Sequence, residues 1–183
     1  RDFFVVVCGE VAAMVALYSR QYGRACVAKF EPATKNMAMI GRSLSAADLV
    51  AAKKGWHDIQ LAMGRLLEHH DVMLCPTVPT PAVPHGVLPN SRIEELLMLA
   101  SHRINVGKWL FSAGLVEQMA TPVLEKMAFT IMGNITGLPG MSVPLHNSSD
   151  GLPIGMQFTG RMNDEETLFS LAAQLERDIG FCS

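Results

Sequence analysis

The feature that most constrains this chain is a pair of short apolar segments joined by turn residues. Met141–Leu145 and Ile154–Thr159 each have the length and apolar composition of a buried strand. Between them lies Asn147–Gly151, whose Asp150-Gly151 pair is typical of a tight hairpin with a positive φ at the glycine. We therefore expect two hairpin-connected strands in this region.

A capped helix is predicted directly after the second of these strands. Asn163 is placed to cap its N-terminus, and Glu166, three residues later, is placed as the reciprocal cap. The apolar residues that follow share one face of the helix: Leu168, Leu171, Ala172 and Leu175. The stretch from 129 to 176 is therefore expected to form strand, hairpin, strand and helix.

The first residues predict a long buried helix. Val5–Tyr22 is apolar on most sides, and Gly23 is its expected end. A membrane span needs about 20 apolar residues, and this run is shorter and contains Glu10. We therefore expect a deeply packed helix, followed by an extended Phe30-Glu31-Pro32 segment, because a residue before proline avoids the α region.

A second long helix and a short strand are expected next. Ser45 and Asp48 form a capping box. Apolar positions then recur every three or four residues from Leu49 to Leu66, which predicts one buried helix face. Asp71–Cys75 is a short apolar strand that Pro76 ends.

The middle of the chain alternates breaks and helices. Pro76–Pro89 holds five prolines in 14 residues and is expected to be a loop after a strand, where ligands bind in open α/β sheets. Helices are predicted over Ser91–Ala100 and Thr121–Met132. Gly107–Gly114, between them, is an irregular apolar segment.

Composition limits the possible functions. The chain has 183 residues, is 49% hydrophobic and carries a net charge of −2. This suits one domain with a core and argues against a nucleic-acid-binding surface. The four cysteines lack paired spacing, which favours reduced thiols and a cytoplasmic location. The histidines lack metal-ligand spacing, and no phosphate-loop lysine is present. We therefore predict no metal and no cofactor.

Several motifs, in the same order and spacing, resemble those of the amidase signature family. They are Asp71-Val72-x-Leu74-x-Pro76-Thr77, Pro81-Ala82, Asn134-x-Thr136-Gly137-x-Pro139, Val143-Pro144, Gly151-Leu152-Pro153-Ile154-Gly155-x-Gln157 and Asp164-Glu165. The resemblance extends from about Phe30 to Glu176, and the N-terminal stretch is most similar to the branch that hydrolyses cyclic dimers of 6-aminohexanoate. It implies that residues 1–183 are the C-terminal portion of a single amidase domain. It implies an α/β fold in which this portion forms part of a mixed β-sheet core flanked by helices.

The resemblance also implies a serine hydrolase that cleaves carboxamide C–N bonds. In that family a serine pair lies in a glycine-rich Gly-Gly-Ser-Ser-Gly segment, with a lysine upstream of it, and this sequence has no such segment. Ser148-Ser149 lies instead in the predicted hairpin turn. We therefore expect no catalytic residue in this chain, an N-terminal catalytic portion that is absent, and no activity of the chain alone. The alternatives are an inactive binding or interaction module, or one half of a split enzyme that pairs with an N-terminal chain.

Five residues are predicted to line the substrate pocket: Cys8, Thr77, Trp109, Phe111 and Asn134. Thr77 and Asn134 belong to the motifs that carry the resemblance. Cys8 follows an apolar run, and the alternative for it is a small buried hydrophobe. Trp109 and Phe111 lie between two glycines and form either a flap over the pocket or part of the core. The expected ligand is a small amide, with no nucleic acid or membrane partner, and with a homodimer or an N-terminal half as possible protein partners.

Overall fold

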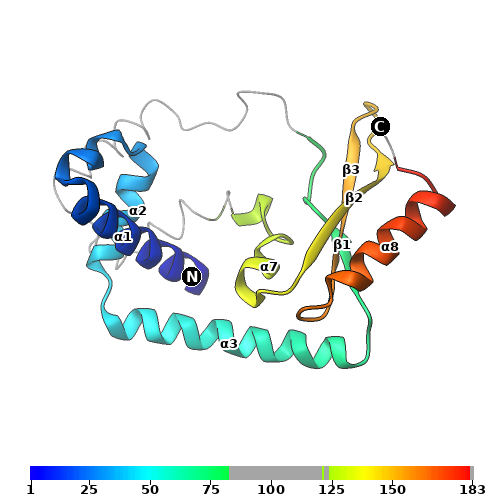
Figure 1. The fold of residues 1–183 in the computed structure, drawn as a ribbon, viewed down its shortest axis with the longest axis horizontal. Coiled ribbons are helices and arrows are strands. Elements are labelled where there is room, and N and C mark those ends of the chain that lie inside the picture. Colours follow the sequence, from blue (N-terminus) through cyan, green and yellow to red (C-terminus); the bar gives the residue numbers. More distant parts are fainter. Residues whose placement is uncertain (83–120, 122–123, 182–183) are drawn as a thin grey trace. The chain divides into compact units, whose positions relative to one another are not determined.

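The computed structural model describes residues 1–82, 121 and 124–181 (Figure 1). The chain divides into two compact units, the first holding Arg1–Gly55 and the second beginning at Trp56. The predicted helix over Ser91–Ala100 and the segment Gly107–Gly114 lie outside the described residues. Each unit is described by itself below.

The first unit is built on two packed helices. These are α1 (Asp2–Tyr22), which ends at Gly23 with a φ of 81°, and α2 (Pro32–Ser43), with the short 3-10 helix η1 (Arg24–Lys29) between them. Cys8 on α1 packs against Met39 and Ile40 on α2. The predicted helix over Val5–Tyr22 is thus confirmed.

The prediction that α1 is packed on most sides is wrong. The buried residues are Val5, Val6, Cys8, Ala12 and Val15, which form one face. Leu17 and Tyr22 are 59% and 61% exposed. By length and composition alone α1 could cross a membrane, but core helices of soluble proteins and signal sequences share that length and composition.

A glycine lets α1 and α2 come into close contact. A methyl group on Gly41 would overlap the carbonyl oxygen of Cys8, and it would lie 2.5 Å from the carbonyl carbon of Cys8 and 2.8 Å from the Cβ of Ala12. Because these atoms belong mainly to the backbone, no side-chain rotation could make room. Glycine at this position therefore fixes how closely the two helices pack.

Helix α2 was not predicted, although the extended segment that leads into it was. Phe30 and Glu31 are extended, with ψ values of 148° and 153°, as expected before proline. Pro32 then occupies the first turn of α2, where its missing N–H costs nothing. The proline that ends the extended segment also begins the helix.

The capping box of the next helix, α3 (Ala46–Glu68), is confirmed. The backbone N–H of Ser45 donates to Asp48 Oδ2 at 2.8 Å, and the N–H of Asp48 donates to Ser45 Oγ at 3.1 Å. The apolar face differs from the predicted one at its end, because Leu67 is buried whereas Leu66 is 40% exposed.

The second unit contains a three-stranded antiparallel sheet with the order β1-β3-β2 (Figure 1). Its strands are β1 (Met73–Pro76), β2 (Gly140–Asn147) and β3 (Pro153–Thr159). The predicted hairpin between β2 and β3 is confirmed, and Gly151 has a φ of 78°. The α/β fold class is confirmed.

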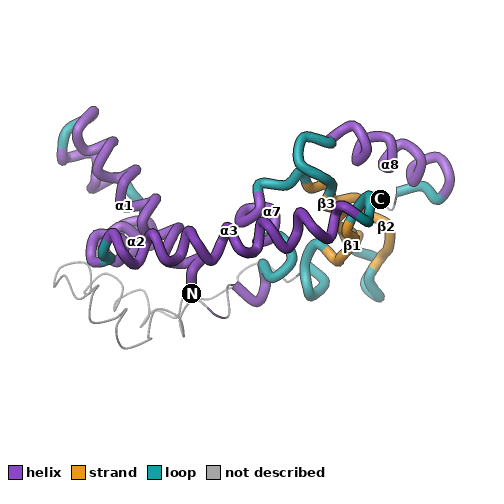
Figure 2. Tube along the Cα trace, turned by 90° about the horizontal axis from the view of Figure 1, so that it is seen from below, coloured by secondary structure: helices purple, strands orange, loops and turns teal. Residues whose placement is uncertain are grey.

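Helix α8 (Glu165–Asp178) covers one face of this sheet (Figure 2). Its Leu168 packs with Val143 and Phe158, all three of them buried. The four apolar positions predicted for its inner face all belong to this core.

The predicted cap of α8 is wrong by one residue. The cap position is Asp164, whose Oδ1 accepts a hydrogen bond of 2.8 Å from the Thr167 hydroxyl. Asn163 has a φ of 61° and turns the chain into the helix. Asparagine tolerates this left-handed conformation, which competes with its use as a cap.

The predicted helix over Thr121–Met132 is also wrong in extent. Residues 127–130 form a turn, in which the N–H groups of Met127 and Ala128 bond to carbonyls three residues earlier. A separate helix, α7 (Ile131–Thr136), follows and ends at Gly137 with a φ of 71°. The turn at 127–130 therefore interrupts the predicted helix just before α7.

Candidate functional site

The second unit contains an open cavity of about 350 Å³ beside the sheet and α7. Phe158 faces α8, so its strand neighbour Gln157, which lines the cavity, faces the opposite side of the sheet. The polar lining residues are Thr77, Thr130, Asn134, Ser142 and Gln157. The other described lining residues are Gly133, Leu138, Gly140 and Met141, so this part of the wall carries no charged side chain.

Two hydroxyl groups meet in this cavity. Thr77 Oγ1 and Ser142 Oγ are 2.5 Å apart, and either can be the donor. Thr77 follows β1 and Ser142 lies on β2, so the two come from the strands on either side of β3. The contact therefore spans the central strand.

Gly155 on β3 makes this contact possible. A methyl group there would lie 2.6 Å from Ser142 Oγ and 2.8 Å from Thr77 Oγ1. The backbone N–H of Thr77 also donates to the Gly155 carbonyl at 2.9 Å, which fixes Thr77 beside the glycine. The two side chains consequently fill the space that a side chain at position 155 would need.

Gln157 and Asn134 supply two neutral amides to the same cavity. Gln157 is 7% exposed and pairs with Ser142 across the strands, and its Nε2 lies 3.5 Å from the carbonyl oxygen of Phe129. Asn134 projects from α7, which is held by a hydrogen bond of 2.9 Å from Gln60 Nε2 on α3 to the Ile135 carbonyl. Both amides are thus carried by elements that are anchored by side-chain contacts.

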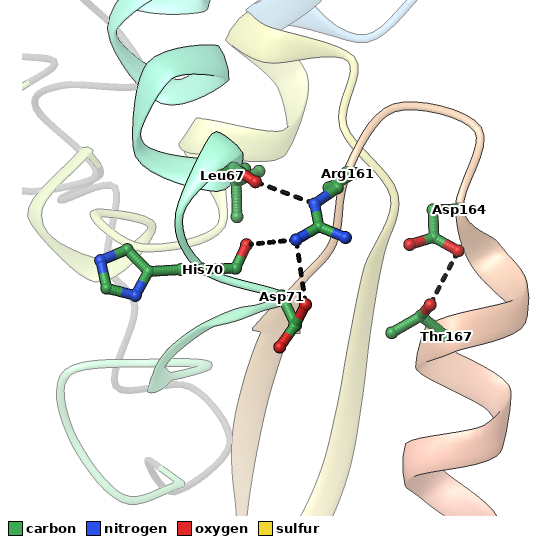
Figure 3. A network of polar contacts seen from close by, with 6 residues as sticks. All are labelled: Leu67, His70, Asp71, Arg161, Asp164 and Thr167. Atoms are coloured by element: carbon green, nitrogen blue, oxygen red, sulfur yellow. Dashed lines mark hydrogen bonds and ion pairs between the residues drawn. The ribbon is translucent and has the colours of Figure 1, made fainter.

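An arginine fixes the position of β1 relative to β3 (Figure 3). Arg161 Nε donates to the carbonyl of Leu67 at 2.8 Å, and its Nη2 donates to the carbonyl of His70 at 3.3 Å and to Asp71 Oδ1 at 2.9 Å. These contacts join Arg161, two residues after β3, to the end of α3 and to the start of the segment that leads into β1. Sequence reasoning did not identify this arginine.

The structure brings two of the five predicted pocket residues together. Thr77 and Asn134 line the cavity. Cys8 is fully buried in the first unit, and burial raises the pKa of its thiol to about 12. A thiol in that environment is a weak nucleophile. Trp109 and Phe111 lie outside the described residues.

Three polar lining residues were not predicted from the sequence: Thr130, Ser142 and Gln157. Ser142 and Gln157 lie on the predicted strands, where position alone does not distinguish a site residue from any other strand residue. In the described part of the chain, no three His, Cys, Asp or Glu residues are grouped as a metal site. Cys8, Cys26 and Cys75 are free thiols.

Comparison with known proteins identifies similar sequences. A family model described as Amidase matches residues 5–169. The A subunit of the glutamyl-tRNA(Gln) amidotransferase from Sulfurimonas denitrificans is 31% identical over 134 residues, which cover 72% of this chain and 23% of that protein. The protein of the same name from Xanthobacter autotrophicus is 54% identical over 52 residues, covering 28% of this chain and 10% of its own length. The chain therefore spans less than a quarter of these relatives.

Solved structures show the same fold. The structure of 6-aminohexanoate cyclic dimer hydrolase matches all of this chain over 36% of its own length, with a TM-score of 0.74 and 22% sequence identity. A crystal structure of an amidase matches 97% of this chain over 34% of its length, with a TM-score of 0.66 and 18% identity. At these identities the likeness concerns the fold.

Proposed function

Because this chain belongs to the Amidase family, we propose that it is part of an enzyme that hydrolyses the C–N bond of carboxamides. The observation that carries the proposal is the match of the family model to residues 5–169. The cavity supports it, since Thr77, Asn134 and Gln157 belong to the motifs that carry the family resemblance and line one hollow. Small-molecule sites use placed polar groups to orient the ligand, and five polar side chains line this cavity.

In this proposal the residues that cleave the C–N bond lie outside these 183 residues. Amide hydrolysis by a serine enzyme needs an activated hydroxyl that attacks the carbonyl carbon, followed by release of the amine and attack of water on the acyl group. The sequence contains no Gly-Gly-Ser-Ser-Gly segment to supply that serine. Ser148 is held in the hairpin turn, where its Oγ accepts a 3.1 Å hydrogen bond from the N–H of Leu152. We propose that residues 1–183 provide scaffold and pocket wall, as the C-terminal portion of one amidase domain.

An amide hydrolysis assay tests whether the catalytic residues lie outside the chain. The purified chain is expected to release no ammonia or amine from simple amides or from the cyclic dimer of 6-aminohexanoate. Addition of a protein segment that carries the Gly-Gly-Ser-Ser-Gly sequence and its upstream lysine is expected to produce turnover. A serine-to-alanine change in that segment is the control and should abolish it. Turnover by the chain alone that survives Ser148→Ala and Ser149→Ala would refute the proposal.

A second candidate is one component of a multisubunit amidotransferase. It is favoured by the curated relatives, which are the A subunits of glutamyl-tRNA(Gln) amidotransferases and are up to 54% identical over short segments. In that case the protein would release ammonia from an amide donor inside a larger assembly. Co-purification of other protein chains, with ammonia release from glutamine that depends on them, would favour this candidate over a free-standing hydrolase or a homodimer.

Two further points remain proposals. We place the protein in the cytoplasm, because its four cysteines lack paired spacing in the sequence and the three in the described residues are free thiols, and cell fractionation tests this. A folded, monodisperse chain that neither turns over amides nor gains activity from any partner would instead favour a binding or interaction module.

A further inference from the structure

We propose that the Thr77–Ser142 hydroxyl pair binds the carbonyl oxygen of an uncharged carboxamide ligand. The inference rests on the proposed function, because it concerns the cavity that we assign to an amide hydrolase. It goes further by identifying the groups that hold the ligand and the ligand charge that the cavity accepts.

The first step concerns the hydrogen atoms of the pair. Each hydroxyl carries one hydrogen and can both donate and accept. At 2.5 Å, one hydrogen lies between Thr77 Oγ1 and Ser142 Oγ. The second hydrogen has no acceptor among the described residues, and both side chains line the cavity. The pair therefore offers one O–H donor to a ligand acceptor.

The second step concerns the strength of that donor. A hydroxyl that already donates or accepts one hydrogen bond is polarised by it, so linked hydroxyls form stronger outward bonds than isolated ones. The pair is held in place by strand pairing on both sides of β3 and by the bond between the Thr77 N–H and the Gly155 carbonyl. A ligand carbonyl thus meets a donor whose orientation is already fixed, which reduces the entropy lost on binding.

The third step concerns the rest of the ligand. Asn134 lines the same cavity, is exposed, and makes no side-chain hydrogen bond within the described part of the chain. Its amide can accept from an N–H group and donate to a carbonyl. A primary or secondary carboxamide carries an acceptor oxygen and an N–H donor on the same carbonyl carbon, so it matches the two kinds of group that the cavity presents.

The fourth step concerns charge. The described lining contains neutral polar groups together with Leu138 and Met141, and no charged side chain. From these described residues, a carboxylate or ammonium group would gain no opposite charge in return for the hydration it loses, whereas a neutral amide loses much less. The preferred ligand is therefore a neutral amide with a short apolar chain, and a free amino acid such as glutamine, which carries both charges, is disfavoured.

Hexanamide and hexanoate are the matched probes, since they share an apolar chain and differ in the charge of the head group. Binding to the full 183-residue chain is measured by NMR titration, following the backbone amides of Thr77 and Ser142. Hexanamide is expected to bind at least about tenfold more tightly than hexanoate, which corresponds to about 1.4 kcal/mol.

Four variants test the role of the pair. Thr77→Val and Ser142→Ala each remove one hydroxyl and are expected to weaken hexanamide binding about tenfold, the usual cost of one hydrogen bond in a ligand site. Thr77→Ser keeps the hydroxyl and is expected to bind like the parent. Ser149→Ala, in the exposed hairpin turn, is the control for loss of a serine elsewhere. Dispersed amide spectra verify that each variant is folded.

The outcomes separate this proposal from the proposed function. Equal affinity for hexanoate and hexanamide, no binding of hexanamide, or unchanged binding in both hydroxyl-free variants would overturn the assignment. These titrations measure binding and need no catalytic nucleophile, so their result can be interpreted whether or not the reconstituted protein hydrolyses amides. Hydrolysis that persists undiminished in Thr77→Val and Ser142→Ala would overturn the hydroxyl site and leave the amide hydrolase intact.

Discussion

The close packing of α1 on α2 makes Gly41→Ala a sharp test of the first unit. In an open helix position, glycine to alanine stabilises a protein by about 0.5–1 kcal/mol, because alanine has the better helix propensity. At Gly41 the new methyl group would overlap the carbonyl oxygen of Cys8 and lie 2.8 Å from the Cβ of Ala12. The two helices would have to separate.

The size of the stability loss depends on which atoms the new methyl group would overlap. Overpacking usually costs about 1–3 kcal/mol, and the upper end applies when backbone rather than a side-chain end must move. Separation would also loosen the contact of Met39 and Cys8, which are 2% and 0% exposed. After subtraction of the gain in helix propensity, we expect Gly41→Ala to lower the free energy of unfolding by about 2 kcal/mol.

Gly64→Ala is the matched control, since Gly64 lies within α3 and a methyl group there meets nothing within 4 Å. It should raise the free energy of unfolding by about 0.5–1 kcal/mol. Urea denaturation followed by circular dichroism measures both variants. We also expect faster alkylation of the Cys8 thiol in Gly41→Ala. If Gly41→Ala proves as stable as Gly64→Ala, the close approach of the two helices is refuted.

Three further predictions concern single residues. Arg161→Ala should lower the free energy of unfolding by about 1 kcal/mol, a modest loss because the partly exposed guanidinium is screened by water; Arg177→Ala, whose ion pair joins adjacent residues, should cause no measurable change. The Cys8 thiol should be alkylated more slowly than the Cys26 thiol at about pH 8. Because burial raises the Cys8 pKa from 9.0 to about 12, the unfolded chain loses this proton at a lower pH than the folded chain does. The free energy of unfolding should therefore fall as the pH rises from 9.0 toward 12. Mass spectrometry of labelled peptides measures the alkylation order, and denaturation at several pH values measures the stability. Cys8→Ala lacks the thiol, so an equally steep fall of its stability with pH would contradict the assignment to Cys8. Gly151→Ala should cost about 1 kcal/mol, because the φ of 78° disfavours a Cβ although the surrounding space is open, and thermal unfolding against Gly151→Asn tests this.

Local signals in the sequence predicted most of the elements that the structure describes. The Ser45–Asp48 capping box and the Asp150-Gly151 turn are correct because each depends on residues within a few positions of one another. Asn163 was misassigned because asparagine suits both a helix cap and a left-handed turn, and only the path of the chain decides between them. Helix α2 was missed because its Pro32 start carries no side-chain cap.

The cavity was only partly predictable, for a physical reason. Thr77 and Asn134 were identified through motifs, whereas the partner of Thr77 is 65 residues away in the sequence. Whether Ser142 faces Thr77 depends on strand register, and a shift of one residue would turn its side chain to the other face. Gly155 can be read from the sequence, but the need for a glycine there depends on Thr77 and Ser142, which approach it only when both neighbouring strands are paired with β3.

The strand order β1-β3-β2 also has a consequence for the folding pathway. Strands β2 and β3 are joined by a short turn, and such hairpins form in about 1–10 μs. Strand β1 must reach β3 across a long intervening stretch of chain, so its docking bears a larger loop-closure entropy and comes later. The Thr77–Ser142 contact links β1 to β2 without direct strand pairing, and it can form only after that last docking step. Competence to bind ligand is therefore expected to appear at the end of folding, and its recovery after dilution from denaturant would time the arrival of β1.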